Sequence, residues 1–511
     1  MLLGRKLLHD NYLPPAGLKV GPLNDYPEKA IQFGEGNFMR AFVDWMINEM
    51  NGRGLFNGRV VLVQPIKEGL CPRINEQNGL YTLYLRGVQK GVLKEEKSIV
   101  TAVSRCIDPY REWAGLLACA ENPSLRFLFS NTTEAGIAYK PEPLTGETPV
   151  SFPAKAAAFL YHRFKAFGGA PESGLIIIPC ELIDRNGDEL KKTVLQHCAD
   201  WKLPGQFTAW LEKSNYFFNS LVDRIVTGFP RDDAGALFAE LGYEDQLLDT
   251  GEIFHLWVIE CPPGFDLEAE LPFRRAGLNV PAVPDMAPYR TRKVRILNGS
   301  HTLIVPVAFL SGLDTVKEAV DDALIGLFLR RSLEEEIIPT LDLPRGEVQV
   351  FAVDVLERFQ NPHIQHYLID IALNSTSKFK TRVLPSLLGC IALEGRLPKL
   401  ICFSLAALCV FFRISGAGST GAEARRDQGP YAVRDSEAAL DFFREAWADC
   451  DGSLPGCLQL AEKVLSSRGL WEADLRQVEG LCALVGSYLH SILSSGMRSA
   501  LEVCLNGGGG E

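Results

Sequence analysis

Three polar residues with complementary side chains lie close together in the second half of the chain. Lys293 is followed by Asn298 five positions later and by His301 after three more. At about 100° per residue of an α-helix, Asn298 lies about 140° and His301 about 80° from Lys293, so all three fall on one side. A poorly hydrated lysine can take a hydroxyl proton, an amide can donate to the oxygen left behind, and an imidazole can orient a substrate. A basic first turn followed by a core histidine is the alternative interpretation.

A glycine-rich turn near the N-terminus follows a short apolar run and precedes an amphipathic stretch. Gly34 allows a tight turn, and Gly36 lets a phosphate group approach the backbone N–H groups at the start of a helix. A dinucleotide is therefore predicted to contact Phe33, Gly34, Gly36, Asn37, Phe38 and Arg40. Met39 stands where the third glycine of the usual fingerprint would be, so a purely structural turn is the alternative.

Polar residues also follow two other predicted strands. Gln64 stands where a carboxylate would bind the adenosine ribose of NAD. A glutamine can bond to the ribose, but it repels a 2′-phosphate less, so the choice between NAD and NADP stays open. Asn131, Thr132 and Glu134 follow the next strand, at the edge where an open α/β sheet binds its ligand. The alternative for them is simple helix capping.

The pattern of the chain changes near residue 285. Before it, short apolar runs at 30–33, 59–64, 125–130 and 175–179 alternate with helical stretches, which predicts parallel βαβ units. Residues 80–97 alternate Tyr, Thr and Val and predict an added antiparallel hairpin. After it, helical periodicity dominates, with a polar loop of small residues at 415–430. We therefore expect an α/β Rossmann-type domain with added β-strands at 1–285 and a mostly α-helical domain at 286–511.

Composition excludes several classes of protein. The 511 residues carry 63 acidic and 52 basic side chains, a net charge of −11, which disfavours nucleic acid as a partner. The longest apolar run, 400–412, falls short of the roughly 20 residues that a membrane span needs. Thirteen cysteines, an odd number with no CxxC pair, predict free thiols in a reducing cytoplasm. His363 and His366 are the one suggestion of a metal pair, and we predict no metal.

Six motifs occur in a fixed order along the chain. They are IQFGEGNFMRAF, SNTTEAGI, CELIDRNGDELKK, NSLVDRI, KVRILNGSHT and RFQNP. In this combination the chain resembles the polyol-specific long-chain dehydrogenases typified by mannitol dehydrogenase. The resemblance implies a Rossmann-type domain, a helical domain, a metal-free active site between them, and NAD as cofactor.

The same resemblance implies roles for individual residues. Lys293 is the expected general acid/base, with Asn298, Asn186 and His301 as its partners. Asp223 and Lys378 match positions that hold substrate hydroxyls. Mannitol-type members read Asp-Asn where this chain has Glu181-Leu182, which argues against a neutral polyol.

A sugar acid is therefore the expected substrate, interconverted with its keto form. Its carboxylate would need a cation, for which the candidates are Arg358, Lys378 and Arg382. The alternatives are a mannitol, fructuronate or sugar-phosphate dehydrogenase of the same family, or a cofactor-binding regulator without catalysis. A monomer or a small homo-oligomer is expected.

Overall fold

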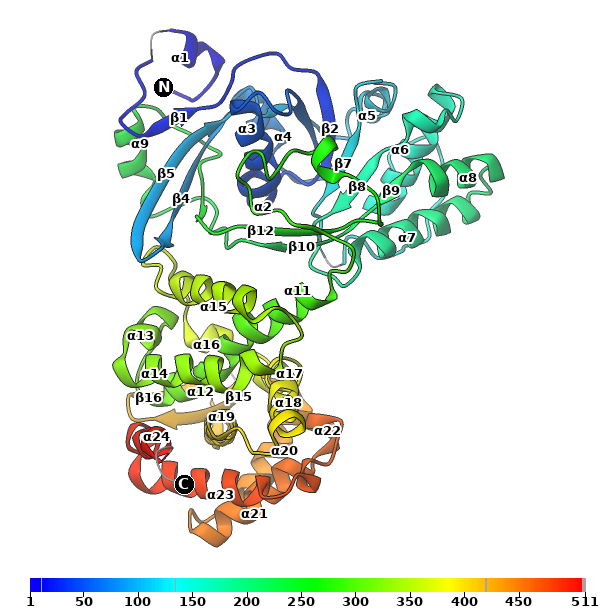
Figure 1. The fold of residues 1–511 in the computed structure, drawn as a ribbon. Coiled ribbons are helices and arrows are strands. Elements are labelled where there is room, and N and C mark those ends of the chain that lie inside the picture. The colour runs from blue at the N-terminus through cyan, green and yellow to red at the C-terminus, as the bar shows by residue number, and fades with distance from the viewer. Residues whose placement is uncertain (11, 134, 419–420, 508–511) are drawn as a thin grey trace. The chain divides into compact units, whose positions relative to one another are not determined.

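The computed structural model describes residues 1–10, 12–133, 135–418 and 421–507. The chain divides into two compact units, Met1–Met286 and Ala287–Glu511 (Figure 1).

A six-stranded sheet forms the centre of the first unit. Its strand order is β6-β3-β2-β7-β8-β9, and all neighbours are parallel. In chain order this is third, second, first, fourth, fifth, sixth, the doubly wound arrangement, with the reversal between β2 and β7. The strands are β2 (Glu28–Phe33), β3 (Arg59–Val63), β6 (Val103–Ile107), β7 (Phe127–Ser130), β8 (Ile176–Pro179) and β9 (Tyr216–Phe217). The four predicted strands are confirmed; β6 and β9 were not foreseen.

Both faces of this sheet are buried. Successive side chains of a strand point to opposite faces, so Ile31 packs into one hydrophobic cluster and Ala30 into another. The Ile31 face is covered by α5 (Trp113–Ala120), α6 (Phe152–Ala166) and α7 (Asn186–Asp200), and the Ala30 face by α3 (Trp45–Gly52). Burial on both sides explains why these strands are continuous apolar runs.

Two smaller sheets are added to the first unit. One has the order β1-β5-β4-β11 and the other β10-β12-β13. The predicted hairpin is confirmed as the antiparallel pair β4–β5, whose turn residues Lys90 and Gly91 both have positive φ, 54° and 70°. The strands are β1 (Leu18–Val20), β4 (Tyr81–Gln89), β5 (Val92–Val100), β10 (Asn219–Asp223), β11 (Asp249–Glu252), β12 (Leu256–Glu260) and β13 (Ala282–Val283). Further helices of the first unit are α1 (Arg5–His9), α4 (Cys71–Glu76), α8 (Gly205–Ser214), α9 (Ala234–Leu241) and α10 (Leu267–Glu270).

One pair of cysteines departs from the expectation of free thiols. Cys71, at the start of α4, forms a disulfide with Cys106 in β6. The partners are 35 positions apart in the sequence and become neighbours only through the sheet. The other eleven cysteines are free.

The second unit is mostly helical, as expected. Its helices begin with α11 (Ala287–Arg292), the π-helix η3 (Lys293–Asn298) and α12 (Gly299–Leu310). They continue with α13 (Val316–Asp321), α14 (Ala323–Arg331), η4 (Ser332–Ile337), α15 (Arg345–Phe359), α16 (Leu368–Ile371), α17 (Ser375–Arg382), α18 (Leu384–Glu394) and α19 (Lys399–Phe411). The last are α20 (Glu437–Trp447), α21 (Leu454–Ser466), α22 (Arg468–Trp471), α23 (Leu481–Ser495) and α24 (Met497–Asn506). Within the described ranges, none of the helices is both long and apolar enough to span a bilayer.

The predicted loop at 415–430 is wrong. An antiparallel sheet occupies this region, with strands β14 (Ile414–Gly418), β15 (Gly421–Arg426) and β16 (Gly429–Ala432). Small residues have a low strand propensity, so the sequence concealed it. Packing against the helices stabilises these strands, because the Tyr431 ring lies 5.0 Å from the rings of both Phe309 in α12 and Phe411 in α19.

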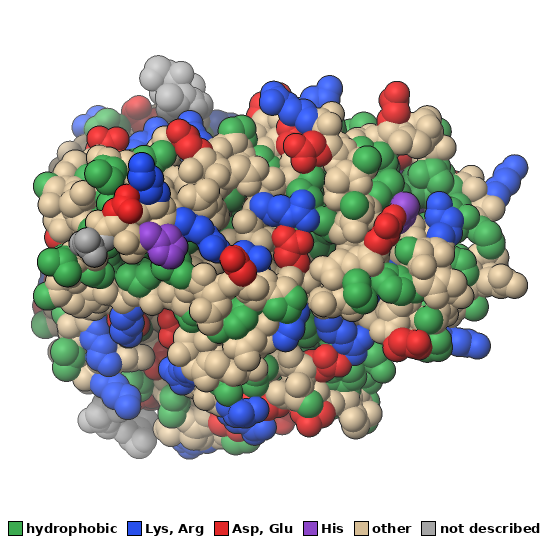
Figure 2. Space-filling model, turned by 90° about the horizontal axis from the view of Figure 1, so that it is seen from above, with side chains coloured by type: hydrophobic (Ala, Val, Ile, Leu, Met, Phe, Trp, Pro, Cys, Tyr) green, Lys and Arg blue, Asp and Glu red, His purple; other side chains and the backbone are tan. Residues whose placement is uncertain are grey.

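The surface carries charges of both signs. On the face drawn in Figure 2, basic and acidic side chains are interspersed. On this face the basic side chains do not form the continuous patch that is typical of proteins that bind a phosphate backbone.

Candidate functional site

The glycine turn connects β2 to a helix that runs without a break from α2 (Asn37–Met39) through the π-helix η1 (Arg40–Asp44) into α3. Gly34 has a φ of +120°, and a Cβ there would lie 2.6 Å from the carbonyl oxygen of Asn131. No other residue fits this position. A Cβ on Gly36 would meet nothing within 4 Å, so open space lies in front of the helix start. Together these glycines leave a cradle at the positive end of the helix.

The neighbours of the glycines fall into two groups. Asn37 and Phe38 are exposed or half-buried and remain available for a ligand. Phe33 is a core residue whose ring packs 5.1 Å from that of Phe152, so only its backbone borders the turn. Arg40 is 2% exposed and donates to the Leu247 carbonyl, and also to Asn37 Oδ1 at 2.5 Å.

Gln64 does not present its amide to a ribose. The side chain is buried, and its Nε2 donates to the carbonyls of Ile66 and Lys67, both at 2.9 Å. Its Oε1 accepts from the backbone N–H of Cys71 at 3.4 Å. The amide therefore holds the loop after β3, and the predicted ribose contact is corrected to this structural role.

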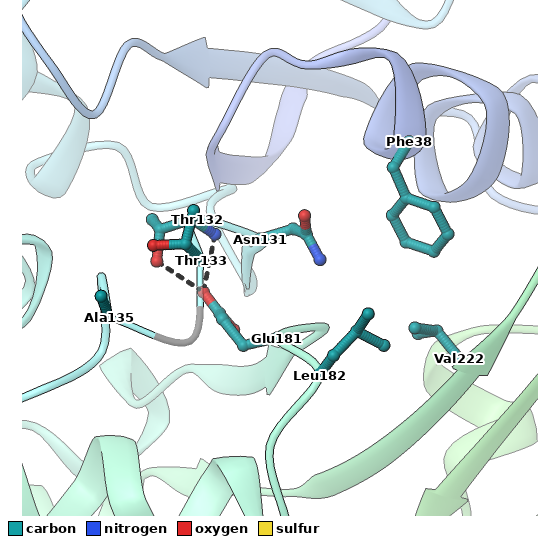
Figure 3. A pocket seen from close by; sticks show the side chains of 8 residues that line it. All are labelled: Phe38, Asn131, Thr132, Thr133, Ala135, Glu181, Leu182 and Val222. Atoms are coloured by element: carbon teal, nitrogen blue, oxygen red, sulfur yellow. Dashed lines mark hydrogen bonds between the residues drawn. The ribbon is translucent and has the colours of Figure 1, made fainter. Parts of the chain in front are cut away.

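A cavity of about 660 Å³ lies at the carboxyl ends of β7 and β8, beside the point where the strand order reverses. Figure 3 shows the side chains around it. They are Phe38, Asn131, Thr132, Thr133, Ala135, Glu181, Leu182 and Val222. The cavity thus brings together the predicted Phe38, Asn131 and Thr132, whereas Glu134 lies outside the described residues. Its position is where open α/β sheets bind their ligands.

Glu181 braces one wall of this cavity. Its carboxylate accepts from Ser130 Oγ at 3.0 Å, and from the backbone N–H and Oγ1 of Thr132 at 3.0 and 3.2 Å. Burial raises the pKa of the carboxyl. This residue joins the ends of β7 and β8, a function that sequence reasoning missed. The sequence did contain a signal for this role, because Glu181 follows one predicted strand and the hydroxyl residues Ser130 and Thr132 lie at the end of another.

Asn186 is a structural residue rather than the predicted catalytic one. Its side chain is 0% exposed, and its Nδ2 lies within 3.1 Å of three carbonyls, those of Pro179, Glu181 and Ser220. Its Oδ1 accepts from the backbone N–H groups of Gly187 and Ser220. With all its polar atoms bonded to backbone, the amide has nothing left to offer a substrate oxygen. The predicted catalytic role is therefore corrected to positioning the Glu181 turn.

This correction predicts the behaviour of Asn186→Ala. Several buried backbone groups would lose their partner, at a cost of about 1–3 kcal/mol each, so we expect a clear loss of stability in urea unfolding. Thr193→Ala is the control, because that hydroxyl only reinforces carbonyls within its own helix. A stable Asn186→Ala protein with a large loss of kcat would instead restore the catalytic assignment.

In the second unit, Lys293 and Asn298 bound a π-helix. A π-helix makes i→i+5 hydrogen bonds, so residues five apart stack on one side, closer than the α-helical estimate of 140° allowed. Asn298 then precedes α12, in which His301 follows three positions later on the same face. The change from π to α geometry thus aligns Lys293, Asn298 and His301 along one side of the segment.

His301 is buried, at 8% exposure, and its Nε2 has no hydrogen-bond partner among the described residues. The imidazole packs 4.2 Å from the Phe359 ring and 4.9 Å from the His366 ring. Burial is the main cause that holds the pKa of His301 well below its usual range. A neutral imidazole with a free ring nitrogen can bond to a hydroxyl.

Cations surround this histidine. A protonated His366 would also lower the pKa of His301, as do the positive charges of Arg358, Arg382 and Lys378. The last two lie on α17, whose Arg382 carbonyl approaches to 3.3 Å of a Cβ built on Gly299. Burial lowers the pKa of Lys378 and of Arg382, as expected for cations held together in a partly dry place. Such a cluster suits an anionic ligand.

The structure also shows where Asp223 and the histidine pair His363 and His366 lie. Asp223 ends β10, one position after Val222 of the cavity, and is buried. His363 and His366 do not lie on a helix, because α16 begins only at Leu368. The described residues contain no group of metal-binding side chains that could hold an ion.

The doubly wound sheet with its glycine turn, together with Lys293, Asn298 and His301 in the helical unit, defines a dehydrogenase that has a Rossmann domain and a helical domain. Residues 28–271 match the mannitol dehydrogenase Rossmann domain, and residues 285–493 match the mannitol dehydrogenase C-terminal domain. The chain belongs to the mannitol dehydrogenase family.

Within the family, the chain is similar to altronate oxidoreductases. It is 46% identical to that of Pectobacterium carotovorum subsp. carotovorum over 485 residues, which cover 94% of this chain and 98% of that protein. It is also 46% identical to that of Enterobacter sp., over 93% of this chain and 97% of the relative.

Two solved structures share the fold. D-sorbitol dehydrogenase in substrate-free form has a TM-score of 0.80 at 22% identity, over 98% of this chain and 100% of that chain. Pseudomonas fluorescens mannitol 2-dehydrogenase, in a ternary complex with NAD and D-mannitol, has a TM-score of 0.67 at 20% identity, over 99% and 100%.

Proposed function

We propose that this protein is an NAD-dependent oxidoreductase that interconverts D-altronate and D-tagaturonate in hexuronate catabolism. The observation that carries the proposal is the 46% identity to altronate oxidoreductases over nearly the full length of both chains. The cationic surroundings of His301 support a sugar acid over a neutral polyol.

The first unit fits a dinucleotide. The cradle at Gly36 would take the pyrophosphate at the backbone N–H groups of Asn37 and Phe38, and the cavity beside Asn131 and Thr132 would take the nicotinamide end. When bound, the nicotinamide supplies the hydride acceptor or donor for the carbinol carbon.

The second unit supplies the proton chemistry. Lys293 takes the proton of the substrate hydroxyl in oxidation and returns it to the oxygen in reduction. Asn298 donates to that oxygen while it carries partial negative charge. His301 orients a neighbouring hydroxyl through its free Nε2, and Asp223 and Lys378 are proposed to hold further hydroxyls. No metal ion is needed, because a protonated lysine and an amide can polarise the carbonyl.

The substrate carboxylate is proposed to bind Arg382, with Arg358 and Lys378 nearby. Arg382→Gln should therefore raise the KM for tagaturonate by at least about tenfold, since a charge-assisted hydrogen bond contributes ~1.5–3 kcal/mol. The kcat should change little. Lys380→Gln removes one charge from the same helix, where it pairs with Glu472, and should leave KM unchanged. An equal loss with neutral fructose would contradict a carboxylate contact.

A panel of substrates tests the function. NADH and NADPH oxidation would be followed with tagaturonate, fructuronate, fructose and fructose 6-phosphate, each with EDTA present. Tagaturonate with NADH should give the highest kcat/KM. A preference for fructose would favour a mannitol dehydrogenase, and preference for either other substrate would favour the corresponding relative. Absence of turnover with all four would favour a cofactor-binding regulator.

We further propose that the enzyme works in the cytoplasm as a monomer or small homo-oligomer on a small-molecule substrate, without nucleic acid or membrane. Light scattering of the purified protein measures the assembly, and cell fractionation tests the compartment. The Cys71–Cys106 disulfide makes the test of the compartment necessary, because disulfides are rare in a reducing cytoplasm.

A further inference from the structure

A second cavity in the first unit is lined by basic side chains, unlike the cavity beside Glu181. Its volume is about 440 Å³, and the two cavities share no lining residue. Its lining residues are Asn37, Arg40, Leu70, Arg73, Phe229, Arg231 and Gln246 to Leu248. The walls come from the start of α2, the start of α4 and two loops on either side of α9. This volume suffices for a small-molecule ligand.

Three arginines line this cavity, and its lining contains no acidic residue. Arg40 is the buried one, and its Nε has no hydrogen-bond partner in the described part of the chain. Asp249 lies 3.7 Å from the Arg40 guanidinium and offsets part of its charge. The carboxylates of Glu35 and Asp44 also interact electrostatically with Arg40.

Arg73 and Arg231 are exposed. Neither side chain forms an ion pair or hydrogen bond with any residue that the structure describes. The cavity therefore holds an excess of positive charge with unused donors. Planar guanidinium groups with free N–H pairs match the oxygens of a phosphate.

The rest of the lining is apolar. Phe229, Leu70, Leu247 and Leu248 offer surfaces for a planar or apolar body attached to the anion. A free inorganic ion would leave these surfaces uncovered, whereas a nucleotide would use both the cations and the aromatic ring. Asn37 joins the cavity to the glycine turn, because its Oδ1 accepts from Arg40.

We propose that this cavity binds the phosphate of an adenine nucleotide through Arg73 and Arg231, with Arg40 at its buried base. This nucleotide is separate from the dinucleotide cofactor, whose pyrophosphate would lie in the cradle at Gly36. The site does not depend on the identity of the sugar substrate.

Binding of AMP to the full-length protein, measured by calorimetry, tests the proposal. The double variant R73Q/R231Q should bind AMP at least tenfold more weakly. R274Q/R275Q is the matched control, because it removes the same charge from two exposed arginines outside the cavity, and its affinity should stay within twofold. Equal affinity of R73Q/R231Q and wild type, equal losses in both double variants, or no AMP binding to wild type would overturn the proposal.

Two further measurements sharpen the result. Thermal unfolding should be the same for R73Q/R231Q and wild type, since neither side chain has a partner to lose, and R73K/R231K should recover part of the affinity. Repeating the AMP titration with saturating NADH tests whether the site is separate from that of the cofactor. AMP binding that persists supports a separate site, and displacement of AMP by NADH would overturn it.

Discussion

Lys293→Ala is expected to lower kcat by about 10²–10⁴-fold, the contribution that general acid–base catalysis typically makes. The physical reason is that alanine can neither take the hydroxyl proton nor return it. The π-helix places Lys293 in line with Asn298, whose amide cannot take up a proton in place of the amine. Steady-state reduction of tagaturonate measures the loss.

Cofactor binding separates this result from unfolding. NADH fluorescence should report an unchanged Kd in Lys293→Ala, because the glycine turn belongs to the first unit. Lys317→Ala is the matched control, since this lysine of the second unit pairs only with Asp321 on its own helix. Near-wild-type kcat in Lys293→Ala would remove the assignment of the base.

Gly36→Val should weaken NADH binding by at least about tenfold, or ~1.4 kcal/mol. The reason is steric, because the open space in front of Gly36 is the space through which a phosphate reaches the backbone N–H groups. The fold itself should tolerate the change, since a Cβ there meets no atom and the φ of Gly36 is −70°. Fluorescence titration gives the Kd, and thermal unfolding checks stability.

Gly205→Val provides the comparison. Gly205 is the first residue of α8, whereas Gly36 is the N-cap of α2, and a Cβ on either meets nothing within 4 Å. Both variants therefore place a β-branched side chain at a helix start without a clash, and only the one at the turn should lose affinity. An unchanged Kd in Gly36→Val would show that the dinucleotide does not approach this turn.

Sequence patterns predicted a structural feature correctly where all the residues that form it lie in one short segment. The buried parallel strands appear in the sequence as apolar runs because both faces of the sheet are covered. The hairpin was predicted from the alternation of Tyr, Thr and Val at 80–97. The turn from Phe33 to Phe38 combined a strand, two glycines and a helix within a few positions. The roles of Lys293, Asn298 and His301 were predicted from the resemblance to the family, because their spacing alone left a basic turn and a core histidine as the alternative.

Other features depended on atoms brought together from distant segments. The small-residue strands at 414–432 form because aromatic rings from α12 and α19 pack on Tyr431. The side chain of Asn186 looked free in the sequence, but the turn after β8 surrounds it with carbonyls.

The sequence by itself therefore determined the two-part α/β and helical architecture and the glycine turn, which follow from periodicity and spacing over a few residues. The lysine, asparagine and histidine of the second unit remain a prediction that rests on the resemblance to the family. Only the tertiary structure decided that Gln64 and Asn186 serve the backbone, that Glu181 braces a cavity, and that three arginines meet beside Asn37. A polar side chain has a fixed chemistry, but its partners are set by which distant backbone groups the fold brings within hydrogen-bonding distance.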